Sequence, residues 1–162
     1  FPEKLLLGIL NSHLDDFNLD YVGDGANRKK IEKIIKRYKL EDKVKLHGFV
    51  NREMVPDFVG KAQCFIMISK AETFGLVYLE AMSMGCLTVA SRHEGMEGII
   101  EDGVNGFLCN AGDEFELAQV INKINNLSQN EINQISQNAI TTAQKLTDSK
   151  VAEYYLNAII KA

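Results

Sequence analysis

The sequence predicts an α/β fold: a doubly wound parallel sheet with helices on both faces, followed by further helices. Two observations support this class. The first two thirds of the chain alternate short β-rich runs with segments of helical periodicity, and from residue 113 onward apolar residues recur only at helical spacing. Such alternation is typical of β-α-β crossovers. The length of 162 residues suits one compact domain, which we expect to span residues 1–162.

Each element has its own signal along the chain. We expect strands at residues 19–22, 44–46, 64–68, 87–90 and 106–108. We expect helices at 5–12, after a cap at Asn27, and at 53–59, 75–84, 113–126, 129–145 and 148–161. The run from 64 to 68 is continuously apolar, which indicates a central parallel strand covered on both faces.

Composition limits the classes of function. Hydrophobic residues make up 46% and charged residues 25% of the chain, so it is an ordinary globular protein rather than a disordered one. The apolar runs are too short to cross a bilayer. Cys64, Cys86 and Cys109 have no metal-ligand spacing and are odd in number, which argues for a reducing compartment, the cytoplasm.

The net charge of -4 is unevenly distributed. Residues 28–45 contain nine basic and three acidic residues, a net charge of +6, so the remainder carries -10. This segment is either a solvated helix face or a surface for phosphates, an anionic membrane or nucleic acid. Nucleic acid is disfavoured, because no row of aromatic residues accompanies the charge.

Ligands of doubly wound sheets bind at the carboxyl ends of the strands. Glycine-containing turns follow the first two predicted strands, although a Gly-Asp-Gly sequence is also a common turn. After the third strand, Gly75 opens a helix whose free N–H groups and dipole favour a phosphate. Glu72 and Glu80 bracket this helix start. Glu80 is either a solvent-facing residue or a carboxylate that holds vicinal hydroxyls.

The series Ser69-x-x-Glu72-x-Phe74-Gly75-Leu76-x-x-x-Glu80-Ala81-Met82 resembles the signature of the group 1 (family 4) retaining glycosyltransferases. Segments 22–25, 47–50, 85–90 and 101–108 match the family in the same order. The family has the GT-B fold, two Rossmann-like domains facing across a cleft, and this chain resembles the C-terminal, donor-binding one. The resemblance implies one nucleotide-sugar-binding domain truncated from a longer two-domain enzyme.

The resemblance also implies residue roles. Glu80 would hold the ribose hydroxyls, Glu72 would contact the donor sugar, and Lys4 would neutralise the diphosphate as it leaves. The backbone N–H groups of Phe74, Gly75 and Leu76 would meet the sugar and phosphates. The remaining donor-binding positions are Gly23, Gly48, Phe49 and Ser69. The resemblance implies no metal and no cofactor, only a nucleotide diphosphate sugar as donor substrate.

The implied activity is sugar transfer with retention to a glycan or lipid-linked acceptor, in bacterial surface polysaccharide biosynthesis. The acceptor would bind an absent N-terminal domain, and the enzyme would work in the cytoplasm, with peripheral membrane association left open. Two alternatives remain: an isolated nucleotide-binding module without activity, and a GT-B nucleotide-sugar epimerase. Leu87 and Gly98 depart from the family pattern, and Gly98 stands where a sugar-contacting glutamate is frequent.

Overall fold

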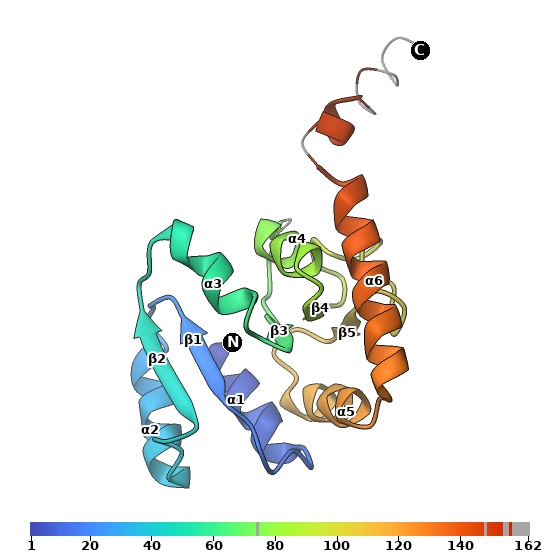
Figure 1. Ribbon diagram of the computed structural model, residues 1–162. Coiled ribbons are helices and arrows are strands. Elements are labelled where there is room, and N and C mark those ends of the chain that lie inside the picture. The colour runs from blue at the N-terminus through green and yellow to red at the C-terminus, as the bar shows by residue number, and fades with distance from the viewer. Residues whose placement is uncertain (74, 148, 154–155, 157–162) are drawn as a thin grey trace.

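The computed structural model describes residues 1–73, 75–147, 149–153 and 156. Strands and helices alternate along it as the sequence predicts (Figure 1). The elements are α1 (Pro2–Asn11), β1 (Leu19–Val22), α2 (Arg28–Tyr38), β2 (Val44–Gly48), a 3-10 turn η1 (Arg52–Met54), α3 (Val55–Val59), β3 (Cys64–Ile66), α4 (Leu76–Ser83), β4 (Leu87–Ser91), β5 (Phe107–Cys109), α5 (Glu114–Asn125) and α6 (Gln129–Lys145).

The predicted α/β class with parallel strands is confirmed. The strands are hydrogen-bonded in two sets, β1-β2 and β3-β4-β5, and every pairing within them is parallel. The two sets are joined by side-chain packing, since Leu19 and Tyr21 of β1 share one hydrophobic cluster with Cys64 and Ile66 of β3. The single sheet expected from the sequence is therefore divided at the β1–β3 boundary.

The central strand of the larger sheet is β4, so the assignment of this place to residues 64–68 is wrong. All five residues of β4 are buried, whereas β3 is a half-buried end strand that stops at Ile66. β4 contains Thr88 and Ser91, which lower its apolar character although both are buried. Thr88 satisfies its hydroxyl locally by donating to the Cys86 carbonyl at 3.1 Å.

Helices cover the sheets from both sides (Figure 1). α1 packs on α5, and Gly8 permits the close approach, because a Cβ there would lie 2.7 Å from Cδ2 of Leu117. α6 packs on α4 and begins with a capping box, in which the Ser128 hydroxyl and the Glu131 carboxylate satisfy each other's backbone N–H groups. These contacts hold α1 and α4, the helices that carry predicted site residues, against their neighbours.

The segment 101–108 is a structural turn. The Asn105 side chain accepts from the Glu101 N–H at 2.8 Å and donates to the Ile99 carbonyl and to Thr142. Asp102 accepts from the Leu108 N–H at 2.9 Å. Asn105 is buried, so its polar side chain needs these partners. The bond to Thr142 connects the turn to α6, and the bond from the Leu108 N–H to Asp102 holds the start of β5.

Two sequence expectations at helix ends have different outcomes. Asn27 precedes α2, but its side chain makes no capping hydrogen bond, because Asn27 is itself in helical conformation. Of the predicted helix at 148–161, residues 149–153 and 156 are helical and the others lie outside the described residues. Within the described part of the chain, no helix combines the length and apolarity needed to cross a bilayer.

Candidate functional site

The loops that follow β1 and β2 meet each other. The Gly23 N–H donates to the Gly48 carbonyl at 2.8 Å, and both glycines have positive φ, 116° and 69°. A side chain is strained in this backbone region, so glycine suits both positions. Phe49, the next residue, has 83% of its surface exposed. These predicted donor-binding positions therefore lie together at the carboxyl ends of the two strands.

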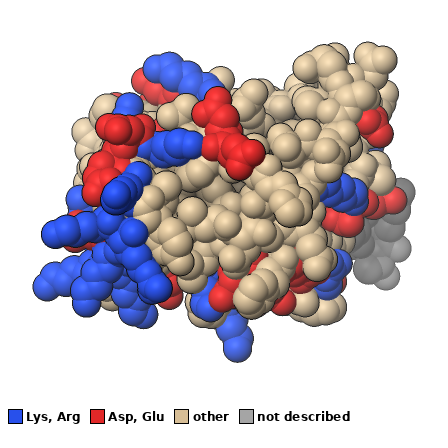
Figure 2. Space-filling model, turned by 90° about the horizontal axis from the view of Figure 1, so that it is seen from below, with Lys and Arg blue, Asp and Glu red and all other residues tan. Residues whose placement is uncertain are grey.

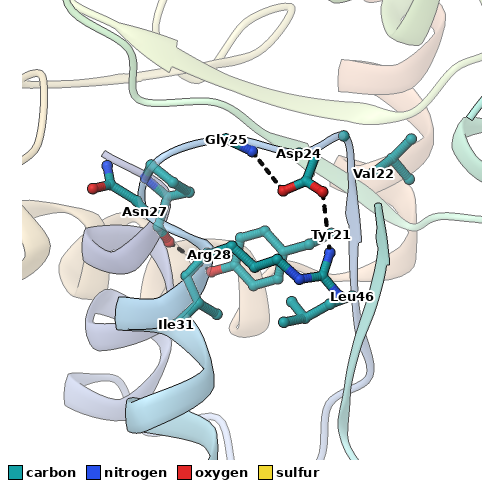
Figure 3. Close-up of a pocket in the computed structure, with 10 residues that line it drawn as sticks. Tyr21, Val22, Asp24, Gly25, Asn27, Arg28, Ile31 and Leu46 are labelled. Atoms are coloured by element: carbon teal, nitrogen blue, oxygen red, sulfur yellow. Dashed lines mark hydrogen bonds and ion pairs between the residues drawn. The ribbon is translucent and has the colours of Figure 1, made fainter. Parts of the chain in front are cut away.

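A pocket of about 200 Å³ opens at this edge (Figure 3). Gly23 lines it, together with Pro2 of α1 and Tyr21 and Val22 of β1. Asn27 and Arg28, at the start of α2, also line it and were not predicted as site residues. No motif indicates that these two residues belong to the site. Their position directly after the 23–25 turn is the sequence feature that could have predicted it.

Hydrogen bonds of the Glu72 backbone hold the loop between β3 and α4 against the loop that follows β4. The Glu72 N–H donates to Oε2 of Glu94 at 2.9 Å, and the Glu72 carbonyl accepts from the Gly95 N–H at 3.0 Å. Glu94 follows β4 and was left without a role by the sequence. Its carboxylate connects the loops after two neighbouring strands, which fixes the backbone of Glu72.

Gly75 starts α4 in the left-handed conformation, with φ 73° and ψ 68°. A Cβ at this position would lie 2.5 Å from the Tyr78 ring and 3.3 Å from Cγ of Glu72. Leu76, the first helical residue, is 54% exposed, and Ser69 is half-buried. Phe74, which was also predicted to contact the donor, lies outside the described residues. The helix start thus presents backbone next to the Glu72 side chain.

Tyr78 connects this helix start to β3 and to the residue that follows it. Its hydroxyl donates to the Met67 carbonyl at 2.6 Å, and its ring meets Phe65 edge-on, with 5.6 Å between centroids. Burial raises the pKa of Tyr78 above its ordinary value, and the carboxylate of Glu72 raises it further. The hydroxyl therefore remains a hydrogen-bond donor at all physiological pH values.

Glu80 is neither buried nor free of partners. Its side chain is 38% exposed, and its Oε1 accepts from the Arg52 guanidinium at 3.1 Å. Arg52 lies in η1 and is 80% exposed, so the pair is accessible to solvent. The carboxylate remains available to hydroxyl groups, and Arg52 is a neighbour that the sequence did not indicate.

Lys4 makes a contact that the sequence did not predict. Its ammonium donates to both carboxylate oxygens of Glu114, at 2.7 and 2.9 Å. Glu114 opens α5, and its side chain is 17% exposed. Hydrogen bonding from Lys4, and then from its own backbone N–H, lowers the pKa of the Glu114 carboxyl. The cation is thus held at the start of α1.

Replacing Lys4 with methionine is expected to lower the free energy of unfolding at neutral pH by up to about 1 kcal/mol, since the pair is partly exposed. Because the folded-state pKa of Glu114 is depressed, the pair stabilises above the unfolded pKa of about 4.3, and the effect is lost as pH falls through the folded value. Urea unfolding at neutral and acidic pH measures this. The matched variant Glu114→Gln should lose a similar amount, and equal stability of Lys4→Met and wild type at neutral pH would contradict the prediction.

No cluster of three or more His, Cys, Asp or Glu side chains suitable for a metal ion occurs among the described residues.

Comparison with known proteins identifies the family of the chain. The model of the glycosyl transferases group 1 matches residues 5–142. The chain belongs to this family.

Relatives within the family have several activities. The chain is 34% identical over 98 residues to an N-acetyl-alpha-D-glucosaminyl L-malate synthase of Bacillus anthracis, which covers 60% of the chain and 25% of that protein. It is 31% identical over 121 residues to the amylovoran biosynthesis glycosyltransferase AmsK of Erwinia amylovora, 71% of the chain and 29% of the relative. The match thus spans only a quarter to a third of these relatives.

Two solved structures share the fold of the chain, and the second of them is a group 1 family protein. Anabaena HepE, in complex with UDP and glucose, superposes with a TM-score of 0.84 at 27% identity, over 100% of this chain and 46% of HepE. The C-terminal domain of LpcC from Francisella tularensis superposes with a TM-score of 0.79 at 20% identity, over 90% of this chain and 78% of that one. The chain is therefore a group 1 C-terminal domain with half of the GT-B fold.

Of the two departures from the family pattern, Leu87 is buried at the start of β4, where it pairs with Cys64. Gly98 has φ 85°, and nothing lies within 4 Å of a Cβ placed there. The loop thus has no carboxylate at this group 1 position. Glu97, its neighbour, contacts His93 at 3.1 Å instead.

Proposed function

We propose that this domain binds the UDP-sugar donor of a retaining glycosyltransferase. The observation that carries the proposal is the start of α4, where Gly75 exposes backbone next to Glu72, with Glu80 further along the helix. HepE, which shares 27% identity over the whole chain, was solved with UDP and with UDP-glucose, and this supports uridine as the nucleoside.

In the proposed complex, Glu80 accepts hydrogen bonds from the ribose hydroxyls and Glu72 contacts the sugar. The N–H groups of Gly75 and Leu76 face the phosphates, where the positive end of the helix dipole stabilises negative charge. Ser69 precedes this loop. The family pattern gives the backbone N–H of Phe74 the same role as those of Gly75 and Leu76.

The base would lie toward Gly23, Gly48 and Phe49, beside the pocket at the start of α2. Lys4 would leave Glu114, or share its charge with it, to neutralise the diphosphate as the bond to the sugar breaks. Cationic and helix-end charge would then do the work for which other transferases use a metal ion.

The remaining parts of the proposal concern the whole enzyme. A glycan or lipid-linked acceptor would bind a second domain, and the sugar would be transferred with retention. The polysaccharide functions named for AmsK and for LpsE of Rhizobium meliloti support surface polysaccharide biosynthesis as the setting. A cytoplasmic location, at the inner face of the membrane, belongs to the same proposal and is supported by three free cysteines.

A titration of the 162-residue chain followed by amide NMR tests donor binding. UDP should shift the resonances of Gly75, Leu76 and Glu80, and GDP and ADP should shift them less at equal concentration. Residues of the 101–108 turn provide an internal control, because they lie in the structural turn. If neither UDP nor the other two nucleotides moved the α4 resonances, donor binding at this site would be excluded.

A second candidate is a binding module that does not transfer sugar by itself. It is favoured by the coverage, since these 162 residues align with 46% of HepE. Incubation with UDP-sugars and measurement of released UDP distinguishes the two. Binding without UDP release supports the module, whereas release by the isolated chain supports a complete catalytic site within it.

A further inference from the structure

One face of α2, continued to the residue that ends the helix, is strongly basic. Ile31 and Ile35 point inward and are buried, which leaves the opposite side of the helix to charged residues. We call the exposed set the basic face; it comprises Lys29, Lys30, Lys33, Lys36, Arg37 and Lys39. Figure 2 shows Lys and Arg side chains gathered on the side of the molecule where α2 lies.

Most of this charge is not neutralised within the chain. Lys30 approaches Glu3 at 3.8 Å, and Arg28, next to the face, is paired with Asp24 and Glu32. In the part of the chain that the structure describes, no carboxylate lies within 4.0 Å of Lys29, Lys33, Lys36, Arg37 or Lys39. An α-helix of this length rises about 16 Å, so the charges form a stripe that a flat anionic surface can meet along its whole length.

We propose that the basic face docks the domain on a bilayer containing anionic lipids. Lysine dominates the face, and its compact point charge suits a diffuse anionic surface better than bidentate readout of single groups. Tyr38 is 46% exposed between Arg37 and Lys39, with the Arg37 guanidinium 5.6 Å from its ring centroid. Tyrosine next to cations is typical of the headgroup region.

The same features disfavour nucleic acid. Single strands are bound on successive aromatic platforms, and Tyr38 is the one aromatic residue in α2. Edge strand β2 carries Lys45, which also disfavours pairing with a β-strand of a partner protein. A lipid surface therefore fits the face better than either alternative.

Docking through this face leaves the candidate donor site open. The stripe lies on the outward side of α2, whereas the pocket lies at the N-terminal end of the helix, beside the 23–25 turn. Gly48 meets this end of the helix, since a Cβ there would lie 3.5 Å from the Arg28 guanidinium. The domain can thus exchange nucleotide while it is held on a membrane that supplies a lipid-linked acceptor.

Vesicle co-sedimentation tests the proposal with the 162-residue chain. The chain should bind vesicles of phosphatidylcholine mixed with phosphatidylglycerol and not vesicles of phosphatidylcholine alone, and binding should fall steeply above an ionic strength of about 0.1 M. The triple variant Lys29→Gln, Lys33→Gln and Lys36→Gln should bind at least tenfold more weakly. Glutamine keeps helix propensity close to that of lysine, so α2 should remain folded.

The matched control, Lys61→Gln, Lys145→Gln and Lys150→Gln, removes equal charge from exposed positions elsewhere and should bind as wild type does. UDP titration of every variant keeps this test separate from donor binding. Equal sedimentation with both vesicle types, equal loss in both triple variants, or tighter binding to a single-stranded oligonucleotide than to the anionic vesicles would each overturn the proposal. If the triple variant does not fold, the single variants Lys29→Gln, Lys33→Gln and Lys36→Gln should each weaken binding to the anionic vesicles, and no loss in any of them would overturn the proposal.

Discussion

Replacing Gly75 with alanine is expected to destabilise the domain by about 2 to 5 kcal/mol, the sum of a left-handed backbone and an overpacked core. The new Cβ would lie 2.5 Å from Cδ2 of Tyr78. The Tyr78 ring cannot move aside easily, because its hydroxyl donates to the Met67 carbonyl and its side chain is 1% exposed. Urea unfolding of the variant measures the loss.

Gly98→Ala is the matched control for backbone strain. Gly98 also has positive φ, 85° against 73°, but nothing lies within 4 Å of a Cβ placed on it. Its substitution should therefore cost less than that of Gly75. Equal losses in the two variants would show that strain alone acts, and a Gly75→Ala loss below about 0.5 kcal/mol would show that the helix start adapts freely.

The fold class and the start of α4 were predictable because both depend on local pattern. The alternation of β-rich and helical patterns can be recognised within short stretches of sequence. The motif that contains Glu72, Gly75 and Glu80 spans only nine residues. The order of strands was less accessible. The central position of β4 could not be predicted, because Thr88 and Ser91 make its sequence less apolar than that of a typical buried strand. Their burial depends on neighbours that come earlier and later in the chain.

The side chains that surround the candidate site were not predictable, because they arrive from distant segments. Glu114 reaches Lys4 across 110 positions, Arg52 reaches Glu80 across 28, and Glu94 reaches the Glu72 backbone across 22. No periodicity or spacing connects such pairs. Each one adds an opposite charge or a hydrogen bond to a predicted residue, so the candidate site is electrostatically more balanced than its motif suggests.

Replacing Glu80 with glutamine is expected to lower the affinity for UDP about 10- to 100-fold, since a charged hydrogen bond contributes about 1.5 to 3 kcal/mol. Stability should change little, because the pair with Arg52 is solvent-exposed and such pairs contribute about 1 kcal/mol or less. Isothermal titration with UDP, alongside urea unfolding, separates the two effects. A carboxylate that served only the surface ion pair would leave UDP affinity unchanged.

A second ligand locates the interaction on the nucleotide. The diphosphate of 2′,3′-dideoxyuridine lacks both ribose hydroxyls, so Glu80→Gln should weaken UDP binding and leave the binding of this analogue nearly constant. Arg52→Gln is the matched protein control: it removes the same ion pair but keeps the Glu80 carboxylate, and should preserve UDP affinity or raise it, because the hydroxyls no longer compete with the guanidinium. If Glu80→Gln weakened both ligands equally, the carboxylate would act on the diphosphate or on the fold of α4, and the assignment of Glu80 to the ribose would be wrong.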